Sequence, residues 1–392
     1  MRICTVHNEY RQPSGEEVVV RGTERLLRAA GHEVIPVTRR SAEIACRRLG
    51  RFRAGFSGIY SAESRRQIRR LLRQARPDIV HVHNLFPLIS PSILPECREQ
   101  AIPVVMTVHN YRLVCPNGMM MTGGQVCERC CGGREYWCLL RNCEGHLLKN
   151  AAHALRNYVA RTRRLFLDNV TLYVPVSEFQ RPSLIRAGFP PDRITVIPNM
   201  VDPQGIDASA NLGDVVAYVG RVRPEKGVLI LMKAAARCAE IPFRAAGSLE
   251  TLPQLPGGAP QNLQFVGFLE GAALHAFYRN ARMVVLPSVW HETFGLPLVE
   301  AGLHGKPVIC SRIGGMPEIV EDGVSGLLVE PGNADDLADK IQHLWARPDL
   351  CREMGRAGRR KALREYSPER YYDRLMAVYE KALALGPGGP VH

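Results

Sequence analysis

The stretch Val284–Ile309, VVLPSVWHETFGLPLVEAGLHGKPVI, contains the pattern that decides the fold of this chain. A short buried strand over 283–286 is followed by a loop, by a helix predicted over 297–304, and by a second strand over 307–311. Pro297 suits the first position of the helix, because its φ is fixed and it lacks an amide donor. This strand–helix–strand order predicts parallel strands joined by a helical crossover.

The same alternation continues outward through both halves of the chain. Further strands are predicted over 1–6, 33–37, 78–82, 102–108, 172–175, 215–220, 243–247, 263–266 and 326–329. A chain of 392 residues is too long for one compact core. We therefore predict an α/β protein of two doubly wound Rossmann-like domains facing a cleft. The first comprises residues 1–175 and is completed by 369–392, and the second comprises residues 176–368.

The composition is typical of a globular protein, with 46% hydrophobic and 23% charged residues. No uncharged apolar stretch approaches the roughly 18 residues needed to span a bilayer. The first residues enter a strand directly, without a basic and apolar leader, so we expect a cytoplasmic protein. The twelve cysteines are then expected to be thiols or metal ligands rather than disulfides.

Positive charge is concentrated in the first domain. Residues 1–175 contain 27 lysines and arginines against 14 acidic residues, whereas the remainder is neutral. Ten of the arginines lie within Arg47–Arg53 and Arg65–Arg76, the second group on a predicted helix. One interpretation is a solvated helix face, and another is docking to anionic lipid on the inner face of a membrane. Nucleic acid is disfavoured because no binding motif accompanies the charge.

The loop after the 283–286 strand has the chemistry of a nucleotide-sugar site. The amides of Phe294, Gly295 and Leu296 are expected at a helix N-terminus, which favours a phosphate. Glu292 on the loop and Glu300 in the first helical turn can accept hydrogen bonds from vicinal hydroxyls, as an acidic residue does with ribose in dinucleotide-binding folds. Either glutamate alone could instead be a solvated loop residue or a favourable charge at the helix start.

Three other predicted strand ends carry residues that could contact a nucleotide-sugar. Arg221 and Lys226, between a strand and a helix, could supply the two cations that a diphosphate leaving group needs. Gly15 lies in a predicted loop after the first strand, and His109 ends another strand of that sheet. A histidine in this position can be structural, but the expected edge of the sheet favours a functional role.

In order along the chain, these motifs resemble glycosyltransferase family 4, whose members are retaining enzymes of the GT-B fold. The resemblance rests on Gly31-His32-Glu33-Val34, Val80-His81-Val82-His83, Thr107-Val108-His109, Ser177-Glu178-Phe179, Ile197-Pro198-Asn199, Val219-Gly220-Arg221, Glu225-Lys226-Gly227, the glutamate pair, Gly305-Lys306-Pro307-Val308 and Gly314-Gly315. The last helix also resembles the terminal segment that crosses back to the first domain in this family. The glutamate pair around Phe294-Gly295 is the most specific of these signals.

The resemblance implies a role for each candidate. Glu300 would bind the nucleotide ribose and Glu292 a hydroxyl of the transferred sugar, while Arg221, Lys226 and the Phe294–Leu296 backbone would hold the diphosphate. His109 would contact the donor sugar and Gly15 would approach the phosphate. The first domain would bind the acceptor and the second the donor. No metal would be needed for catalysis.

The implied activity is transfer of a hexosyl group from a UDP-, GDP- or ADP-sugar to a glycan or lipid-linked acceptor in polysaccharide or glycoconjugate synthesis. A non-hydrolysing sugar-nucleotide epimerase has the same architecture and is the alternative. A non-catalytic binding protein is a third interpretation, which the cation pair disfavours.

An insert over 115–143 interrupts the first domain and is rich in cysteine. Cys127 and Cys130 have the spacing of a zinc ligand pair, and Cys115 and Cys143 could complete a structural site, with Cys138 as a substitute. The alternative is a loop of reduced thiols without metal.

Overall fold

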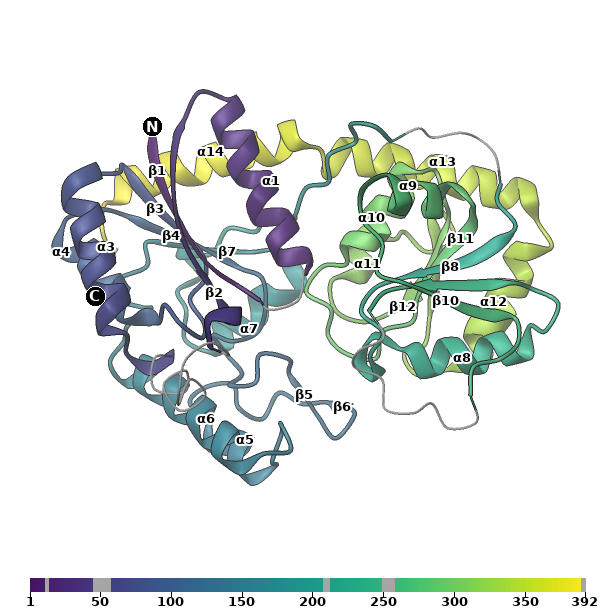
Figure 1. Ribbon diagram of the computed structural model, residues 1–392, viewed down its shortest axis with the longest axis horizontal. Coiled ribbons are helices and arrows are strands. Elements are labelled where there is room, and N and C mark those ends of the chain that lie inside the picture. Colours follow the sequence, from purple (N-terminus) through teal and green to yellow (C-terminus); the bar gives the residue numbers. More distant parts are fainter. Residues whose placement is uncertain (11–13, 45–57, 207–211, 249–257, 389–392) are drawn as a thin grey trace. The chain divides into compact units, whose positions relative to one another are not determined.

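The computed structural model describes residues 1–10, 14–44, 58–206, 212–248 and 258–388. Its two compact units are residues 1–123, 127–199 and 371–392 (unit 1) and residues 124–126 and 200–370 (unit 2) (Figure 1). Each unit has its own parallel sheet, so the prediction of two doubly wound α/β domains is confirmed. No helix in the described ranges is long and apolar enough to cross a membrane.

Unit 1 is built on a five-stranded parallel sheet of order β2-β1-β3-β4-β7. Its strands are β1 (Arg2–Glu9), β2 (Glu33–Arg40), β3 (Ile79–Asn84), β4 (Val104–Val108) and β7 (Leu172–Pro175). Its helices are α1 (Gly15–Ala29), α3 (Ala62–Ala75), α4 (Leu94–Glu99), α5 (Tyr136–Leu140), α6 (Leu147–Thr162), α7 (Arg181–Arg186) and α14 (Pro368–Leu385). A two-stranded ribbon, β5 (Met121–Thr122) and β6 (Gln125–Val126), lies in the insert. Figure 1 shows α1 in front of the large sheet and α14 behind it.

Unit 2 is built on a six-stranded parallel sheet of order β10-β9-β8-β11-β12-β13. Its strands are β8 (Val215–Val219), β9 (Phe243–Ala246), β10 (Leu263–Gly267), β11 (Ala281–Leu286), β12 (Val308–Ser311) and β13 (Gly326–Val329). Its helices are α8 (Val228–Arg237), α9 (Gly271–Arg279), α10 (Leu296–Leu303), α11 (Met316–Ile319), α12 (Ala334–Trp345) and α13 (Pro348–Glu365). The strand order reverses between β8 and β11, which is where such sheets bind ligands.

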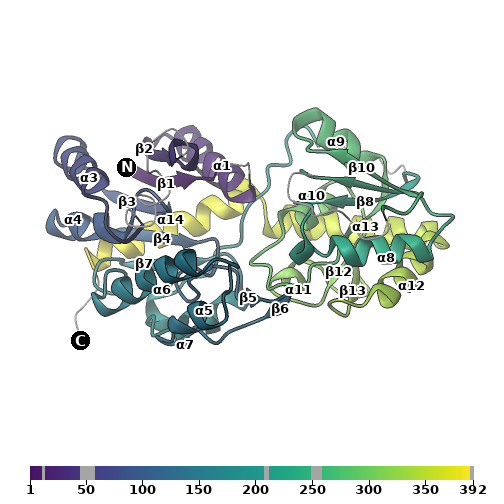
Figure 2. The same cartoon turned by 60° about the horizontal axis from the view of Figure 1, so that its bottom comes forward.

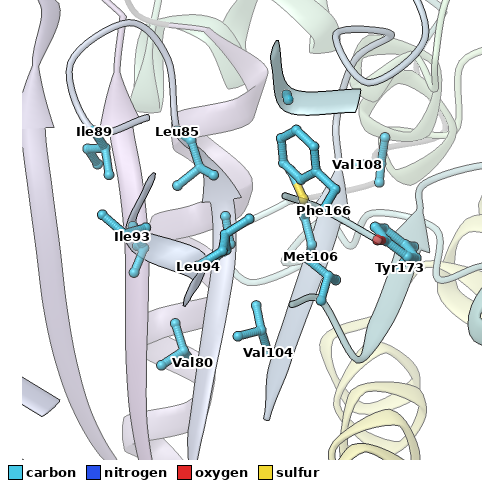
Figure 3. Close-up of a cluster of buried hydrophobic side chains, with 14 of the residues drawn as sticks. Val80, Leu85, Ile89, Ile93, Leu94, Val104, Met106, Val108, Phe166 and Tyr173 are labelled. Atoms are coloured by element: carbon cyan, nitrogen blue, oxygen red, sulfur yellow. The ribbon is translucent and has the colours of Figure 1, made fainter. Parts of the chain in front are cut away.

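The core of unit 1 lies between the sheet and the segments that follow β3 and β7. Figure 3 shows aliphatic side chains of β3 and β4 against those of the η2 turn (Pro91–Ile93) and α4. The strands β3 and β4 are buried along their whole length. Burial of both faces is typical of a parallel sheet that is covered by helices on both sides.

The boundary between the units falls later than predicted. Residues 176–199, assigned from the sequence to the second domain, belong to unit 1. Leu184, Phe189 and Ile194 lie in its hydrophobic core, and the Phe189 ring meets that of Tyr173 edge-on at 4.8 Å. These apolar side chains keep the segment with unit 1, although the motif at Ser177 resembles the start of a new unit.

The C-terminal helix α14 is tied to unit 1 by tyrosine hydroxyls. Thr23 Oγ1 of α1 donates to Tyr371 Oη at 3.1 Å. His81 of β3 is fully buried, with Nδ1 2.7 Å from Tyr379 Oη and Nε2 2.7 Å from Thr107 Oγ1. Burial lowers the pKa of His81 to about 3, so the ring is neutral and both nitrogens have partners.

Replacing Tyr379 with phenylalanine should therefore destabilise unit 1, because the buried His81 Nδ1 would lose its partner. We expect a loss of about 1–3 kcal/mol in the free energy of unfolding, measured by urea denaturation. Tyr136→Phe, at a tyrosine that is half exposed, is the matched control and should change little. Equal unfolding energies for the two variants would contradict this account of α14.

Candidate functional site

Two loops at the switch point of unit 2 are joined by a hydrogen bond and a close approach between their backbones. The Val289 amide, after β11, donates to the Glu225 carbonyl, after β8, at 3.0 Å. Gly227 has φ +76°, and a Cβ there would lie 1.7 Å from the Pro287 carbonyl oxygen. Only glycine fits this approach. The loops that carry Lys226 and Glu292 are thereby held next to each other.

Lys226 and Glu292 form an ion pair at this junction. Lys226 Nζ lies 2.6 Å from Glu292 Oε1, and Ser288 Oγ donates to the same oxygen at 2.7 Å. The side chains are only 16% and 5% exposed, and Lys226 Nζ lies 5.1 Å from the centre of the Trp290 ring. Sequence reasoning assigned the two residues to different parts of a ligand and missed that they contact each other.

The ion pair determines the charge of Glu292. Burial alone would raise the pKa of Glu292, but the Lys226 charge and the hydrogen bonds from Lys226 and Ser288 outweigh it and hold the pKa below its ordinary value. Glu292 is therefore ionised at neutral pH and can only accept hydrogen bonds.

The backbone of Glu292 is also held from the other side, by the Gly314-Gly315 pair. The Gly315 amide donates to the Glu292 carbonyl at 2.8 Å. Gly314 has φ +64°, and a Cβ there would lie 2.3 Å from the Glu292 carbonyl oxygen. The loop position therefore depends on glycines from two other segments.

The helix after this loop begins one residue earlier than predicted. Gly295 is its N-cap, with φ 117°, and α10 starts at Leu296, so Pro297 is the second helical residue rather than the first. The amides of Gly295 and Leu296 lie at the positive end of the helix. The Phe294 side chain is buried and meets the Tyr366 ring edge-on at 5.5 Å. Phe294 thus packs into unit 2 with its side chain, and only its backbone is a candidate for ligand contact.

Glu300 lies deeper in α10 than the predicted first turn, because it is the fifth residue of the helix. Tyr278 Oη of α9 donates to Glu300 Oε2 at 2.6 Å. Burial raises the pKa of Glu300, with the Tyr278 hydrogen bond opposing it. The pKa of Glu300 is therefore raised, whereas that of Glu292 is lowered.

Arg221 lies two residues after the end of β8 and is exposed. Its carbonyl accepts a hydrogen bond from the buried Tyr218 hydroxyl at 2.9 Å, which fixes the turn. Its guanidinium makes no ion pair within the part of the chain that the structure describes. It differs in this from Lys226, whose charge is already paired.

In unit 1, three histidines gather at the end of the sheet. His81 and His83 alternate along β3 and share a face, and their ring centroids are 4.1 Å apart. His83 Nδ1 lies 3.0 Å from Nε2 of His109, which follows β4. Burial lowers the pKa of His109 to about 3, so it is neutral at physiological pH. The predicted residue His109 is therefore part of a buried polar row.

A second polar group of unit 1, around Glu16, was missed from the sequence. Tyr10 Oη donates to Glu16 Oε2 at 3.2 Å, and Arg112 Nη1 donates to Tyr10 Oη at 2.8 Å. His7 Nδ1 lies 3.8 Å from Glu16 Oε1. Burial raises the pKa of Glu16 to about 7. The polar run His7-Asn8-Glu9 at the end of an otherwise apolar strand was the signal that could have found it.

The sequence predicts Gly15 in the loop before the first helix, but Gly15 is the first residue of α1. Ser14 is the N-cap: its side chain accepts from the Glu16 amide, and its own amide donates to Glu17 Oε2 at 2.9 Å. This capping box extends the helix back to residue 15.

Comparison with known families matches residues 13–204 to the model described as Glycosyltransferase Family 4 and residues 209–361 to Glycosyl transferases group 1. The two matched ranges together cover nearly the whole chain. The chain belongs to glycosyltransferase family 4.

Solved structures share the fold of this glycosyltransferase. Sucrose-phosphate synthase from Thermosynechococcus elongatus matches with a TM-score of 0.74 at 19% identity, over 98% of this chain and 99% of that chain. HepE from Anabaena in complex with UDP-glucose matches with a TM-score of 0.67 at 18% identity, over 98% of this chain and 100% of that chain. The fold is therefore GT-B.

Among curated relatives, a D-inositol 3-phosphate glycosyltransferase of Segniliparus rotundus is 34% identical over 225 residues. That match covers 51% of this chain and 50% of the relative. The chain thus spans about half the length of the curated relatives it matches.

The cysteine insert of the glycosyltransferase brings several of its thiols near one another. Across the described ranges, no group of three or more histidine, cysteine, aspartate or glutamate side chains is placed to hold a metal ion. Cys115 hydrogen-bonds with Cys130, which lowers the pKa of Cys115 to about 7, while Cys127 is partly exposed. Burial and the neighbouring Cys143 raise the pKa of Cys138 to about 12. Cys130 interacts with Cys115, Cys138 and Cys143, and the zinc site expected from Cys115, Cys127, Cys130 and Cys143, with Cys138 as a substitute, stays a prediction.

The basic helix α3 is partly neutralised. Arg65 and Arg69 both pair with the buried Glu96, and Ile68 and Leu72 of its apolar stripe lie in the core of unit 1. This stripe is therefore not available to a membrane. The other arginine cluster, Arg47–Arg53, lies outside the described residues.

The opposite pKa shifts of Glu292 and Glu300 can be tested by measuring the free energy of unfolding at two pH values. Glu292, with its pKa lowered, stabilises the fold above the ordinary glutamate pKa, and this contribution is lost as pH falls. Glu292→Gln should therefore cost about 3 kcal/mol of unfolding free energy at neutral pH, and less near pH 4.5. Glu300, with its pKa raised, contributes stability that is lost as pH rises, so Glu300→Gln should stabilise at neutral pH. Urea denaturation at both pH values measures this, and effects of the same sign in both variants would refute it.

Proposed function

We propose that this chain is a retaining glycosyltransferase that moves a hexosyl group from a nucleotide-diphosphate-sugar to a glycan or lipid-linked acceptor, in glycoconjugate or cell-surface polysaccharide synthesis. The observation that carries the proposal is the Lys226–Glu292 pair beside the start of α10, at the switch point of unit 2. The likeness to HepE, which holds UDP-glucose, and to D-inositol 3-phosphate glycosyltransferases supports it.

The donor would bind unit 2 at three points. The amides at the start of α10, with the exposed Arg221, suit a diphosphate. Lys226 would share its ammonium between Glu292 and a phosphate oxygen. The ionised Glu292 would accept a hydrogen bond from a hydroxyl of the transferred sugar, and Glu300, held by Tyr278, would accept from the ribose.

The transfer itself needs no metal in this proposal. The bond from the anomeric carbon to the leaving phosphate oxygen breaks while the acceptor oxygen bonds to the same face of that carbon. The acceptor proton passes to the leaving phosphate, so the products are the glycoside and the nucleoside diphosphate. Arg221 and Lys226 would stabilise the negative charge that develops on the leaving group. His109 and Gly15 of unit 1 stay predicted donor contacts by family resemblance.

A thermal-shift screen against UDP-, GDP- and ADP-sugars tests donor binding. A ligand at a hundred times its dissociation constant should add about 2.7 kcal/mol of stability. Arg221→Ala should abolish the shift, because it removes the unpaired cation. Arg360→Ala, at an exposed arginine of α13, is the matched control and should keep the shift. No shift with any nucleotide-sugar would overturn the proposed donor site.

Kinetics and product analysis separate glycosyl transfer from epimerisation. Lys226→Met should lower kcat about 10²–10³-fold, as expected for removing one group that stabilises transition-state charge. Product analysis by NMR should show the anomeric configuration of the donor retained, and product only when an acceptor is present. Conversion of the nucleotide-sugar without any acceptor would instead favour an epimerase.

A further inference from the structure

Helix α6 presents its apolar residues outward. Leu147, Leu148, Leu155 and Tyr158 are 61%, 68%, 48% and 51% exposed. At 3.6 residues per turn they fall within about 100° of arc on one side of the helix. The buried positions on the other side are Asn150, Arg156, Asn157 and Ala160. This is the reverse of an ordinary surface helix, which turns its apolar stripe to the core.

The polar residues of the inner side have defined partners. Asn150 Nδ2 donates to Asn142 Oδ1 at 2.6 Å, and the Glu144 amide donates to Asn150 Oδ1 at 3.0 Å. Arg156 Nη2 donates to the Pro116 carbonyl at 2.7 Å, with its guanidinium 4.2 Å from the centre of the Phe86 ring. The orientation of α6 is therefore fixed by these contacts, and the outward direction of the leucines follows from it.

The neighbouring helix α5 also carries exposed leucines. Figures 1 and 2 both show α5 beside α6. Leu139 and Leu140 of α5 are 37% and 67% exposed. We call Leu139, Leu140, Leu147, Leu148, Leu155 and Tyr158 the leucine face. Exposed apolar side chains grouped in this way mark an interaction surface.

The charge around the leucine face is positive. Residues 129–164 contain eight lysines and arginines but only Glu135 and Glu144 as acids. Glu135 is paired with Arg161 and Glu144 with Lys149. The exposed cations Arg129, Arg134, Arg141 and Arg163 have no acidic partner in the described ranges. Arg141 lies before α6 and Arg163 directly after it.

From this combination we infer that the leucine face docks on an anionic lipid surface, with the leucines in the acyl boundary and the arginines at the headgroups. Exposed leucines flanked by unpaired cations are the features of an interfacial helix. A second copy of the chain fits less well, since a two-fold interface would bring the same cations together. The docking surface is thus α5–α6 and not α3, whose apolar stripe is buried.

Vesicle flotation of the full chain tests the inference without donor or acceptor, so its outcome is independent of the proposed function. The chain should float with vesicles of phosphatidylcholine and phosphatidylglycerol, less with phosphatidylcholine alone, and less at high salt. Leu148→Ser with Leu155→Ser should weaken binding by at least about tenfold. The double variant Arg141→Gln with Arg163→Gln should weaken binding to the anionic vesicles and leave binding to phosphatidylcholine vesicles unchanged.

Two matched controls make the result decisive. Leu363→Ser, at an exposed leucine of α13, and Arg66→Gln with Arg70→Gln, on the exposed side of α3, should bind as the parent does. Thermal unfolding checks that every variant folds. Absent flotation, loss only in the α3 variant, or a dimer that Leu148→Ser with Leu155→Ser converts to monomer would each overturn the inference.

Discussion

The ion pair between Lys226 and Glu292 is the central contact of the candidate site in unit 2. It joins the loop after β8 to the loop after β11, the two strands between which the sheet order reverses. Neither residue could be buried alone without a large cost, because an unpaired charge in a protein interior is strongly destabilising. The backbone contacts of Gly227 with Pro287 and of Gly314 with Glu292 bring the loops close enough for the pair to form.

The two units stabilise buried ionisable side chains in different ways. In unit 2, the buried charge of Glu292 is balanced by a neighbouring cation. In unit 1, burial keeps His81 and His109 neutral, and their ring nitrogens are satisfied by hydroxyls or by another histidine. A neutral imidazole donates from one nitrogen and accepts at the other, so a row of histidines can bond internally without any charge.

The helix α6 departs from the usual rule that apolar residues face the core. Its inner side holds amide and guanidinium groups: Asn150 accepts from the Glu144 amide, and Arg156 donates to the Pro116 carbonyl of the insert. The leucines are left on the outer side as a consequence. Cys115 and Met120 of the insert pack into the core of unit 1, whereas α5 and α6 leave leucines exposed among basic residues.

Sequence patterns alone predict the α/β class, the two domains and the loops that carry the candidate site, because strand-to-helix alternation and glycine positions are local signals. They also place Arg221, Lys226 and Glu292 in the loops after strands and Glu300 in the helix that follows. The contacts of Lys226 with Glu292 and of Glu300 with Tyr278 are evident only in the folded structure. The same is true of the place of residues 176–199 in unit 1. Each of these depends on side chains from segments far apart in the chain, and periodicity cannot report which of them meet. For the same reason, the burial of Ile68 and Leu72 on α3 and the exposure of the leucines of α6 follow from tertiary packing.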